Sequence, residues 1–486
     1  MSTEHETGQF HVMSIQRQFS GGVAWMAFGN WTEQAVNFLI FVILARLLGA
    51  EAFGLLAMAT VFVVLSEFLV RETLSEALIS LPDLRPDHLN STFWLLAMFG
   101  GGVTAVLVVG AWAIGWIYGE PRIVPIMQAL SLTVPMIALT AVPVGLLRRE
   151  MRFRILSLRA IAGVVAGGVV GIAMAVAGAG VWALVGQRLV QVGVNIVLAW
   201  GAVDWRPARK FDKQAATEVG QFGGQVIALR AGEIALTQIP ILVVGAVAGP
   251  IATGLYAMAW RIVDLAAVLI AMPLRQASQP AFAAISREGG DAVEFLLRLT
   301  ALAGWIAFPA FAGLAILAEP FLMTVFGQKW LDAAPVLSAL AMLGAYLSIE
   351  KQHQSFVLAA GNARSIAAMT WIEAGIAAIA IWLILPFGLA WAAGAQVAIL
   401  YALWPIRFAI LGRLSDRRWR EFTVPHIWPV MGSSFMGIMV WMIVTRLEDD
   451  TFLQLVTGSL AGSATYLGFT LIFQKDRLKL ARSFIR

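Results

Sequence analysis

The chain alternates between long apolar runs and short polar connections. A helix needs about 20 mostly apolar residues to cross the hydrocarbon core of a bilayer, and roughly 14 segments of the chain meet this requirement. We expect spans near residues 22–46, 53–71, 92–117, 123–146, 157–178, 181–201, 218–247, 251–275, 296–318, 331–359, 366–385, 388–411, 426–445 and 451–473. The connections are too short to form a soluble domain, so any chemistry takes place within the membrane body.

Composition agrees with this pattern. The chain of 486 residues is 59% apolar and only 13% charged, whereas soluble proteins are about half apolar. The sequence therefore predicts an all-α integral membrane protein. There is no cysteine, the five His residues show no metal-ligand spacing, and no phosphate-binding loop is present. We expect no metal site, no cofactor and no catalytic residues.

The basic residues collect on alternate connections between the apolar runs. About 24 Lys and Arg residues lie on one side and about four on the other. The four are Arg46, Arg122, Lys329 and Arg446. Cytoplasmic loops carry the excess of Lys and Arg in membrane proteins, so both termini should be cytoplasmic. The net charge of +5 is thereby explained by topology, and we expect no nucleic-acid partner.

The chain contains an internal repeat. Residues 49–59 read GAEAFGLLAMA and residues 249–259 read GPIATGLYAMA, which agree at seven positions without a gap. Tyr118-Gly119 is similarly matched by Phe326-Gly327, and Trp182-Ala183 by Trp391-Ala392. The separation stays near 200 to 210 residues, so the repeating unit has about six spans. Six is an even number, so we expect two parallel six-helix bundles related by a pseudo-twofold axis along the membrane normal.

This repeat predicts the domain organisation. We expect a cytoplasmic N-terminal segment over residues 1–21, a first bundle over 22–205 and a second over 206–412. Residues 413–486 would add two further transmembrane helices and a basic cytoplasmic tail. Within the first bundle, Gly163, Gly167 and Gly171 recur at four-residue spacing, which is typical of a seam between closely packed membrane helices.

The sequence resembles the Wzx-type polysaccharide and oligosaccharide flippases, the polysaccharide transporter family of the multidrug/oligosaccharidyl-lipid/polysaccharide exporter superfamily. The similarity covers most of the first 360 residues. It is carried by LARLLGAEAFGLLAMA at 44–59, Phe93-Trp94, YGEP at 118–121, VPVGLLRREMRFR at 142–154, GVWALVGQ at 180–187 and GLYAMAWRI at 254–262. Relatives often carry Arg and Asp in span seven, where this chain has Thr237 and Pro240.

The resemblance implies a function. Such a protein would move a polyprenyl-diphosphate-linked oligosaccharide from the cytoplasmic to the periplasmic leaflet of the bacterial inner membrane by alternating access, for lipopolysaccharide, exopolysaccharide or capsule synthesis. Its expected partners are this substrate, membrane lipids, and polysaccharide polymerase and export machinery. A drug or organic-cation antiporter of the same superfamily and a lipid II flippase are alternatives with the same fold. A membrane glycosyltransferase or polymerase is disfavoured, because no loop is long enough to hold catalytic carboxylates.

Ionisable residues inside spans are the candidate site residues, because each costs about 2.5 to 3.5 kcal/mol to insert. Arg230 with Glu233, and Arg261 with Asp264, are three residues apart and share a helix face. One interpretation is that these pairs neutralise each other in a packed interface. The other is that the arginines line a cleft and hold the diphosphate or acidic sugars of the substrate, since guanidinium binds such oxygens bidentately.

The remaining candidates are isolated in the sequence. Arg275 and Arg188 are further cavity cations, and Glu33 and Glu67 are carboxylates that either couple transport to a proton or cation or contact a neighbouring helix. We expect Arg275, together with Glu350 and Lys351, to lie near the cytoplasmic ends of their helices, where long side chains extend to the interface.

Overall fold

The computed structural model describes residues 29–80, 85–214, 217, 224–287, 290–447 and 450–473. In these ranges the secondary structure is helical throughout, without a strand. Large apolar side chains are exposed along many helices, as on α3 (Pro86–Ile117), where Val106, Val109 and Trp112 are about 70% exposed. Such surfaces are unfavourable in water and are suited to lipid. The prediction of an all-α membrane protein is confirmed.

Twelve described helical segments are long and apolar enough to cross a membrane. One of them, Ala231–Arg275, has 45 residues, a helical length of about 68 Å that exceeds two crossings of a ~30 Å core. It lies in α9 (Gly224–Arg287), where Gly249 breaks the helix with a φ of 77° and a ψ of −172°. Residues 29–47 form a further helix. With α9 divided at Gly249, the twelve segments correspond to thirteen of the predicted spans. The helix of residues 29–47 lies in the remaining predicted span, 22–46, whose first residues are outside the described ranges.

The chain forms two compact units. The first unit comprises Met1–Leu48 and Leu55–Ala231, and the second comprises Gly49–Gly54 and Gly232–Arg486. The predicted segments 1–21 and 474–486 lie outside the described residues, and the boundaries at 206 and 413 stay predictions.

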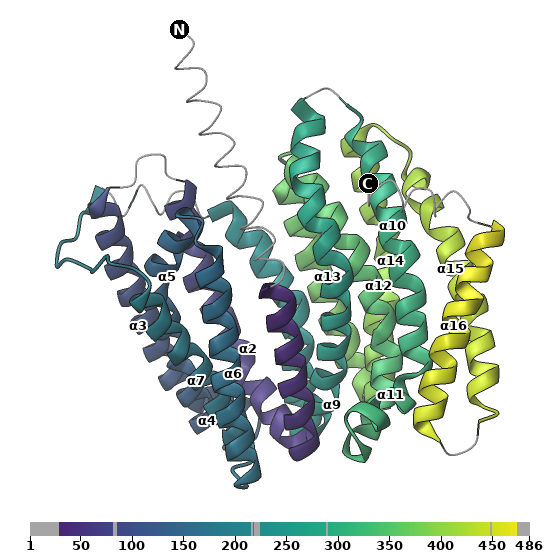
Figure 1. Cartoon of the computed structure of the whole chain (residues 1–486), viewed down its shortest axis with the longest axis horizontal. Helices are drawn as coiled ribbons and strands as arrows, with labels where there is room; N and C mark the ends of the chain where they lie inside the picture. The colour runs from purple at the N-terminus through teal and green to yellow at the C-terminus, as the bar shows by residue number, and fades with distance from the viewer. Residues whose placement is uncertain are drawn as a thin grey trace. The chain divides into compact units, whose positions relative to one another are not determined.

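In the first unit the helix of residues 29–47 is followed by five of the described candidate spans. Their helices can be followed along the chain in Figure 1. Their helices are α2 (Ala50–Ser80), α3, α4 (Ile123–Ser131), α5 (Thr133–Arg149), α6 (Phe153–Val176) and α7 (Val181–Gly201). The first residues of α2 belong to the second unit. Helix α5 packs against α3, α4, α6 and α7, and α7 packs against α4, α5 and α6.

The second unit repeats this order and then continues. After α9 come α10 (Ala292–Ile316), α11 (Ala318–Val325), η1 (Gln328–Ala333), α12 (Ala334–Ala359), α13 (Ala363–Ile384), η2 (Leu385–Phe387) and α14 (Leu389–Ser415). The last two helices are α15 (Trp419–Val444) and α16 (Thr451–Phe473). They pack against each other and against α10, at the yellow end of the chain in Figure 1.

The internal repeat recurs in the backbone of the two units. Gly119 and Gly327, which the repeat aligns, have φ angles of 64° and 91° and lie shortly before the short helices α4 and η1. Gly180 and Gly388 also have positive φ, and each directly precedes the last helix of its six-span repeat. Glycine enters this region without a steric penalty, so the repeat preserves the turns that connect the spans.

The segments 50–54 and 250–254, which contain the glycine of each GLxAMA motif, approach closely within the second unit. A Cβ atom on Gly54 would lie 1.8 Å from the carbonyl oxygen of Pro250, and one on Gly254 would lie 1.9 Å from that of Ala50. Any side chain larger than hydrogen would separate the two backbones. The motif therefore specifies a backbone-to-backbone crossing.

A second close approach joins α6 to α7 in the first unit. Cβ atoms on Gly163 and Gly167 would lie 2.9 and 2.5 Å from the carbonyl oxygens of Gln191 and Gln187. The predicted glycine seam is thus confirmed as a packing surface. It holds α7 so that Gln191 and Asn195 line a cavity in the same unit.

Replacing Gly167 by Ala should lower the free energy of unfolding by about 1 to 3 kcal/mol, because the added methyl group overpacks the seam. Gly110→Ala on α3 is the control, since a Cβ there meets nothing within 4 Å. Thermal melting of the purified protein measures both effects. Equal melting temperatures for the two variants would contradict a packed α6–α7 seam.

Candidate functional site

The first unit encloses a polar cavity of about 730 Å³. Its walls come from the helix of residues 29–47 and from α5, α6 and α7. The lining residues that carry charge or hydrogen-bonding groups are Asn30, Glu33, Thr140, Arg148, Ser157, Arg159, Arg188, Gln191 and Asn195. A polar cavity of this size within apolar helices is the first candidate for a binding site.

Arg188 lines the cavity and forms an ion pair with Glu67. Its Nη2 atom lies 2.6 Å from Glu67 Oε2, and the hydroxyl of Thr133 donates to Glu67 Oε1 at 2.6 Å. The Glu67 side chain is only 7% exposed, whereas Arg188 is 37% exposed. Glu67 therefore acts as an ion-pair carboxylate that holds Arg188 in place from α2.

The cavity also contains the other first-unit carboxylate predicted from the sequence. Glu33 lines it and interacts electrostatically with Arg159 on α6. Arg148, at the end of α5, is a third lining arginine. Arg148 and Arg159 belong to the roughly 24 basic residues that the sequence pattern assigned to the cytoplasmic side, and neither was predicted to line a cavity. The position of Arg159 within α6 was the signal that could have identified it.

The predicted charges of the second unit form a different group. Lys351 on α12 donates to Glu233 on α9 at 3.1 Å, and Asp264 lies in the electrostatic field of both Arg261 and Lys351. Arg261 is exposed, and Lys351 is 30% exposed. The structure thus brings Glu233, Asp264 and Lys351 together, a partner set that spacing along one helix does not reveal.

Two other predicted cations lie on α9, Arg275 in the second unit and Arg230 in the first. Arg275 is half-buried on α9, and its backbone carbonyl accepts a hydrogen bond from Ser278. Arg230 lies in the helical part of α9, but its side chain is outside the described residues. Its pairing with Glu233 stays a prediction.

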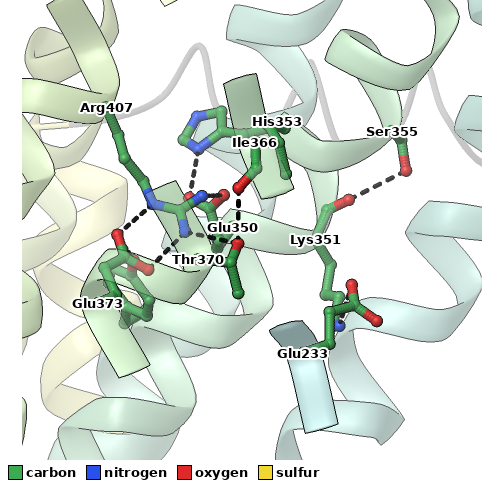
Figure 2. A network of polar contacts seen from close by, with 10 residues as sticks. Glu233, Glu350, Lys351, His353, Ser355, Ile366, Thr370, Glu373 and Arg407 are labelled. Carbon is green, nitrogen blue, oxygen red and sulfur yellow. Dashed lines mark hydrogen bonds and ion pairs between the residues drawn. The ribbon is translucent and has the colours of Figure 1, made fainter. Parts of the chain in front are cut away.

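A fully buried charge cluster surrounds Arg407 of α14 (Figure 2). The guanidinium group donates to both carboxylate oxygens of Glu373, to Glu350 and to the hydroxyl of Thr370. The side chains of Arg407, Glu350 and Glu373 are 5%, 4% and 0% exposed. The expectation that Glu350 extends to the interface is wrong, because α13 and α14 cover it.

The cluster extends through α12. Tyr346 donates to Glu373 at 3.1 Å, and His353 Nδ1 lies 3.3 Å from Glu350. Lys351 follows Glu350 but points to the opposite side of the helix, toward Glu233, as Figure 2 shows. Helix α12 therefore directs one charge into the α13–α14 interface and the next toward α9. The Arg407 cluster links three helices by ion pairs and is too enclosed to admit a large ligand.

Together, the fold and the polar cavity define a class: a multi-pass α-helical membrane protein of the transporter type. Residues 43–335 match the family described as polysaccharide biosynthesis protein. The chain belongs to this family, which confirms the resemblance found in the sequence.

Three curated relatives cover between 66% and 96% of the chain. The teichuronic acid biosynthesis protein TuaB of Bacillus subtilis is 25% identical over 96% of this chain and 99% of its own length. The lipopolysaccharide biosynthesis protein WzxC of Escherichia coli is 24% identical over 71% of each chain. The succinoglycan biosynthesis transport protein ExoT of Rhizobium meliloti is 24% identical over 66% of this chain and 65% of its own.

Solved structures show the fold. The lipid II flippase MurJ in an inward closed conformation superposes with a TM-score of 0.73 at 13% identity, covering 93% of this chain and 99% of MurJ. An inward-facing multidrug resistance transporter of the MATE family gives a TM-score of 0.61 at 15% identity, covering 82% of this chain and 94% of its own. At these identities the likeness concerns the fold alone.

Replacing Arg407 by Met should destabilise the protein by about 3 to 5 kcal/mol, because two buried carboxylates lose their counter-charge. Arg298→Met is the matched control, since Arg298 pairs with Glu294 on the exposed face of α10 and such pairs contribute about 0 to 1 kcal/mol. Thermal melting compares the two variants. If they melt together, the Arg407 cluster does not hold α12, α13 and α14.

Proposed function

We propose that this protein is a flippase that moves a polyprenyl-diphosphate-linked oligosaccharide from the cytoplasmic to the periplasmic leaflet by alternating access. Family membership and the names of TuaB, WzxC and ExoT support a role in making a cell-surface polysaccharide. The MurJ-like fold supports a flipping mechanism by analogy of architecture.

The observation that carries the proposal is the charge of the first-unit cavity. Three guanidinium groups and one carboxylate line it, along with several amides and hydroxyls. Positive charge in a low-dielectric surrounding attracts anions and repels cations. A drug or organic-cation antiporter would need the opposite sign. A lipid II flippase remains the alternative that shares this charge and the fold.

In this proposal, cations of the second unit bind the diphosphate of the substrate. Arg261 is the first residue that we assign to the diphosphate, because it is exposed and occurs in the family-like GLYAMAWRI string. Arg275 assists it, and Arg230, near the end of the first unit, is a further candidate cation for the substrate. Arg188 lines the first-unit cavity, Asp264 and Glu233 restrain the neighbouring cations, and Glu33 is the candidate coupling carboxylate.

The cellular setting follows from the same proposal. The protein acts in the bacterial inner membrane with both termini in the cytoplasm, as a transporter and not as an enzyme. It hands its substrate to a polysaccharide polymerase and to export machinery on the periplasmic side.

Cells that lack this protein should accumulate undecaprenyl-diphosphate-linked oligosaccharide on the cytoplasmic leaflet. Restoring the wild-type protein should clear it, whereas Arg261→Ala should reduce the flipping rate about tenfold or more, because a charge-assisted contact contributes about 1.5 to 3 kcal/mol. Mass spectrometry of lipids accessible from each leaflet measures this.

The matched control is Arg298→Ala, which removes an exposed arginine from the same unit and should clear the intermediate like the wild type. If the deletion strain accumulates nothing and becomes sensitive to cationic drugs, the flippase proposal fails in favour of the antiporter.

The topology can be tested by cysteine labelling, since the chain has no cysteine of its own. Ala177→Cys, at the end of α6, and Ala360→Cys, at the end of α12, both introduce thiols at exposed positions. A membrane-impermeant maleimide added to intact spheroplasts should label position 177 and spare position 360, because Lys and Arg favour the cytoplasmic side. The reverse pattern would invert the proposed orientation.

A further inference from the structure

We infer that the first-unit cavity binds a sugar residue carrying one carboxylate, and that it is a glycan site and not a diphosphate site. The inference rests on the proposed function and assigns one part of the substrate to one cavity.

The lining offers acceptors as well as donors. Glu33 contributes a partly exposed carboxylate, and the amides of Asn30, Gln191 and Asn195 each carry a carbonyl oxygen. Asn195 Oδ1 is buried with no hydrogen-bond partner among the described residues. The Asn195 side chain lines the cavity, and its broad terminal torsion would let the oxygen turn to accept a hydrogen bond from a ligand.

Acceptors in the wall need a donor on the ligand. The hydroxyl groups of a sugar donate and accept, so they match a carboxylate, amides and the hydroxyls of Thr140 and Ser157. Ionised phosphate oxygens only accept. A diphosphate would leave these oxygens unpaired and would bring at least two negative charges toward Glu33.

The charge balance indicates a single anionic group. Arg188 is paired with Glu67 at 2.6 Å, and Arg159 interacts with Glu33. Arg148 is the third lining arginine and is exposed, so the group carries one positive charge in excess. One carboxylate on the sugar meets this excess, and its planar oxygens fit the guanidinium of Arg148 bidentately.

The cavity is also held in a fixed shape. The α6–α7 glycine seam sets Gln191 and Asn195, and Glu67 with Thr133 sets Arg188. Because the wall is already ordered, a ligand that matches it binds without a large free-energy cost for rearranging these side chains.

The test is equilibrium binding to the purified full-length protein in nanodiscs, followed by saturation-transfer NMR. The probes are a methyl hexuronide, the corresponding neutral methyl hexoside and inorganic diphosphate. The hexuronide should bind about tenfold or more tightly than the neutral hexoside, in line with a charge-assisted contact. Diphosphate should not displace it.

Variants assign the two contacts. Arg148→Gln should abolish the preference for the hexuronide, and Arg148→Lys should retain most of it. Asn195→Leu should weaken the binding of both sugars about three- to tenfold, as expected for one lost hydrogen bond. Arg298→Gln on α10 should change neither the preference for the hexuronide nor the affinity for the two sugars. Melting temperatures verify that each variant is folded.

Three results would overturn the inference. These are equal binding of the charged and neutral sugars, binding of neither sugar, or displacement of the hexuronide by diphosphate in a manner that needs Arg148. The flippase proposal fails separately: intact sugar binding without any lipid-linked intermediate in deletion cells counts against flipping alone, and flipping without sugar binding counts against this site alone.

Discussion

A polar group inside the hydrocarbon region must find its partner within the protein, and this constraint shapes both units. Lipid supplies no hydrogen bonds, so an unpaired charge there costs several kcal/mol. Arg407 meets the constraint by binding Glu373, Glu350 and Thr370 at once. In the first unit, Glu67 accepts from Arg188 and Thr133. Each cluster draws its members from three helices, so satisfying the charges also fixes which helices are neighbours.

Apolar helices in lipid lack the hydrophobic driving force that packs soluble proteins, and close backbone contact replaces it. The glycines at the α6–α7 seam serve this purpose, as do Gly54 and Gly254. The second pair explains why the repeat is conspicuous in the sequence at residues 49–59 and 249–259. Most apolar positions in a membrane helix can exchange one large side chain for another, but a position where two backbones touch can hold only glycine.

This difference determines how much the sequence could predict. The spans follow from hydropathy, and the repeat matched Gly119 with Gly327, which both have positive φ angles in the structure. The glycine seam follows from four-residue spacing. The partners of Arg407 did not follow, because Glu350 and Glu373 lie 57 and 34 residues away. In a helix that is apolar on nearly all sides, the sequence has no amphipathic pattern. The pattern therefore cannot show which neighbouring helix a charged side chain faces. The pairing of Glu233 with Lys351, 118 residues away, was missed for the same reason.

A charged residue is structural when its ion pairs use all of its hydrogen-bonding capacity, and it can be functional when charge and exposed surface remain for a ligand. The Arg407 guanidinium is engaged by three side chains and is 5% exposed, so it has little capacity for a ligand. The first-unit cavity has about 730 Å³ of space, one arginine more than its paired charges require, and a buried amide oxygen that has no partner in the described part of the chain. Both groups are expensive to place in a membrane. The Arg407 cluster offsets that cost by linking helices, whereas the cavity leaves part of it uncompensated until a ligand supplies the missing anion and hydrogen-bond donors.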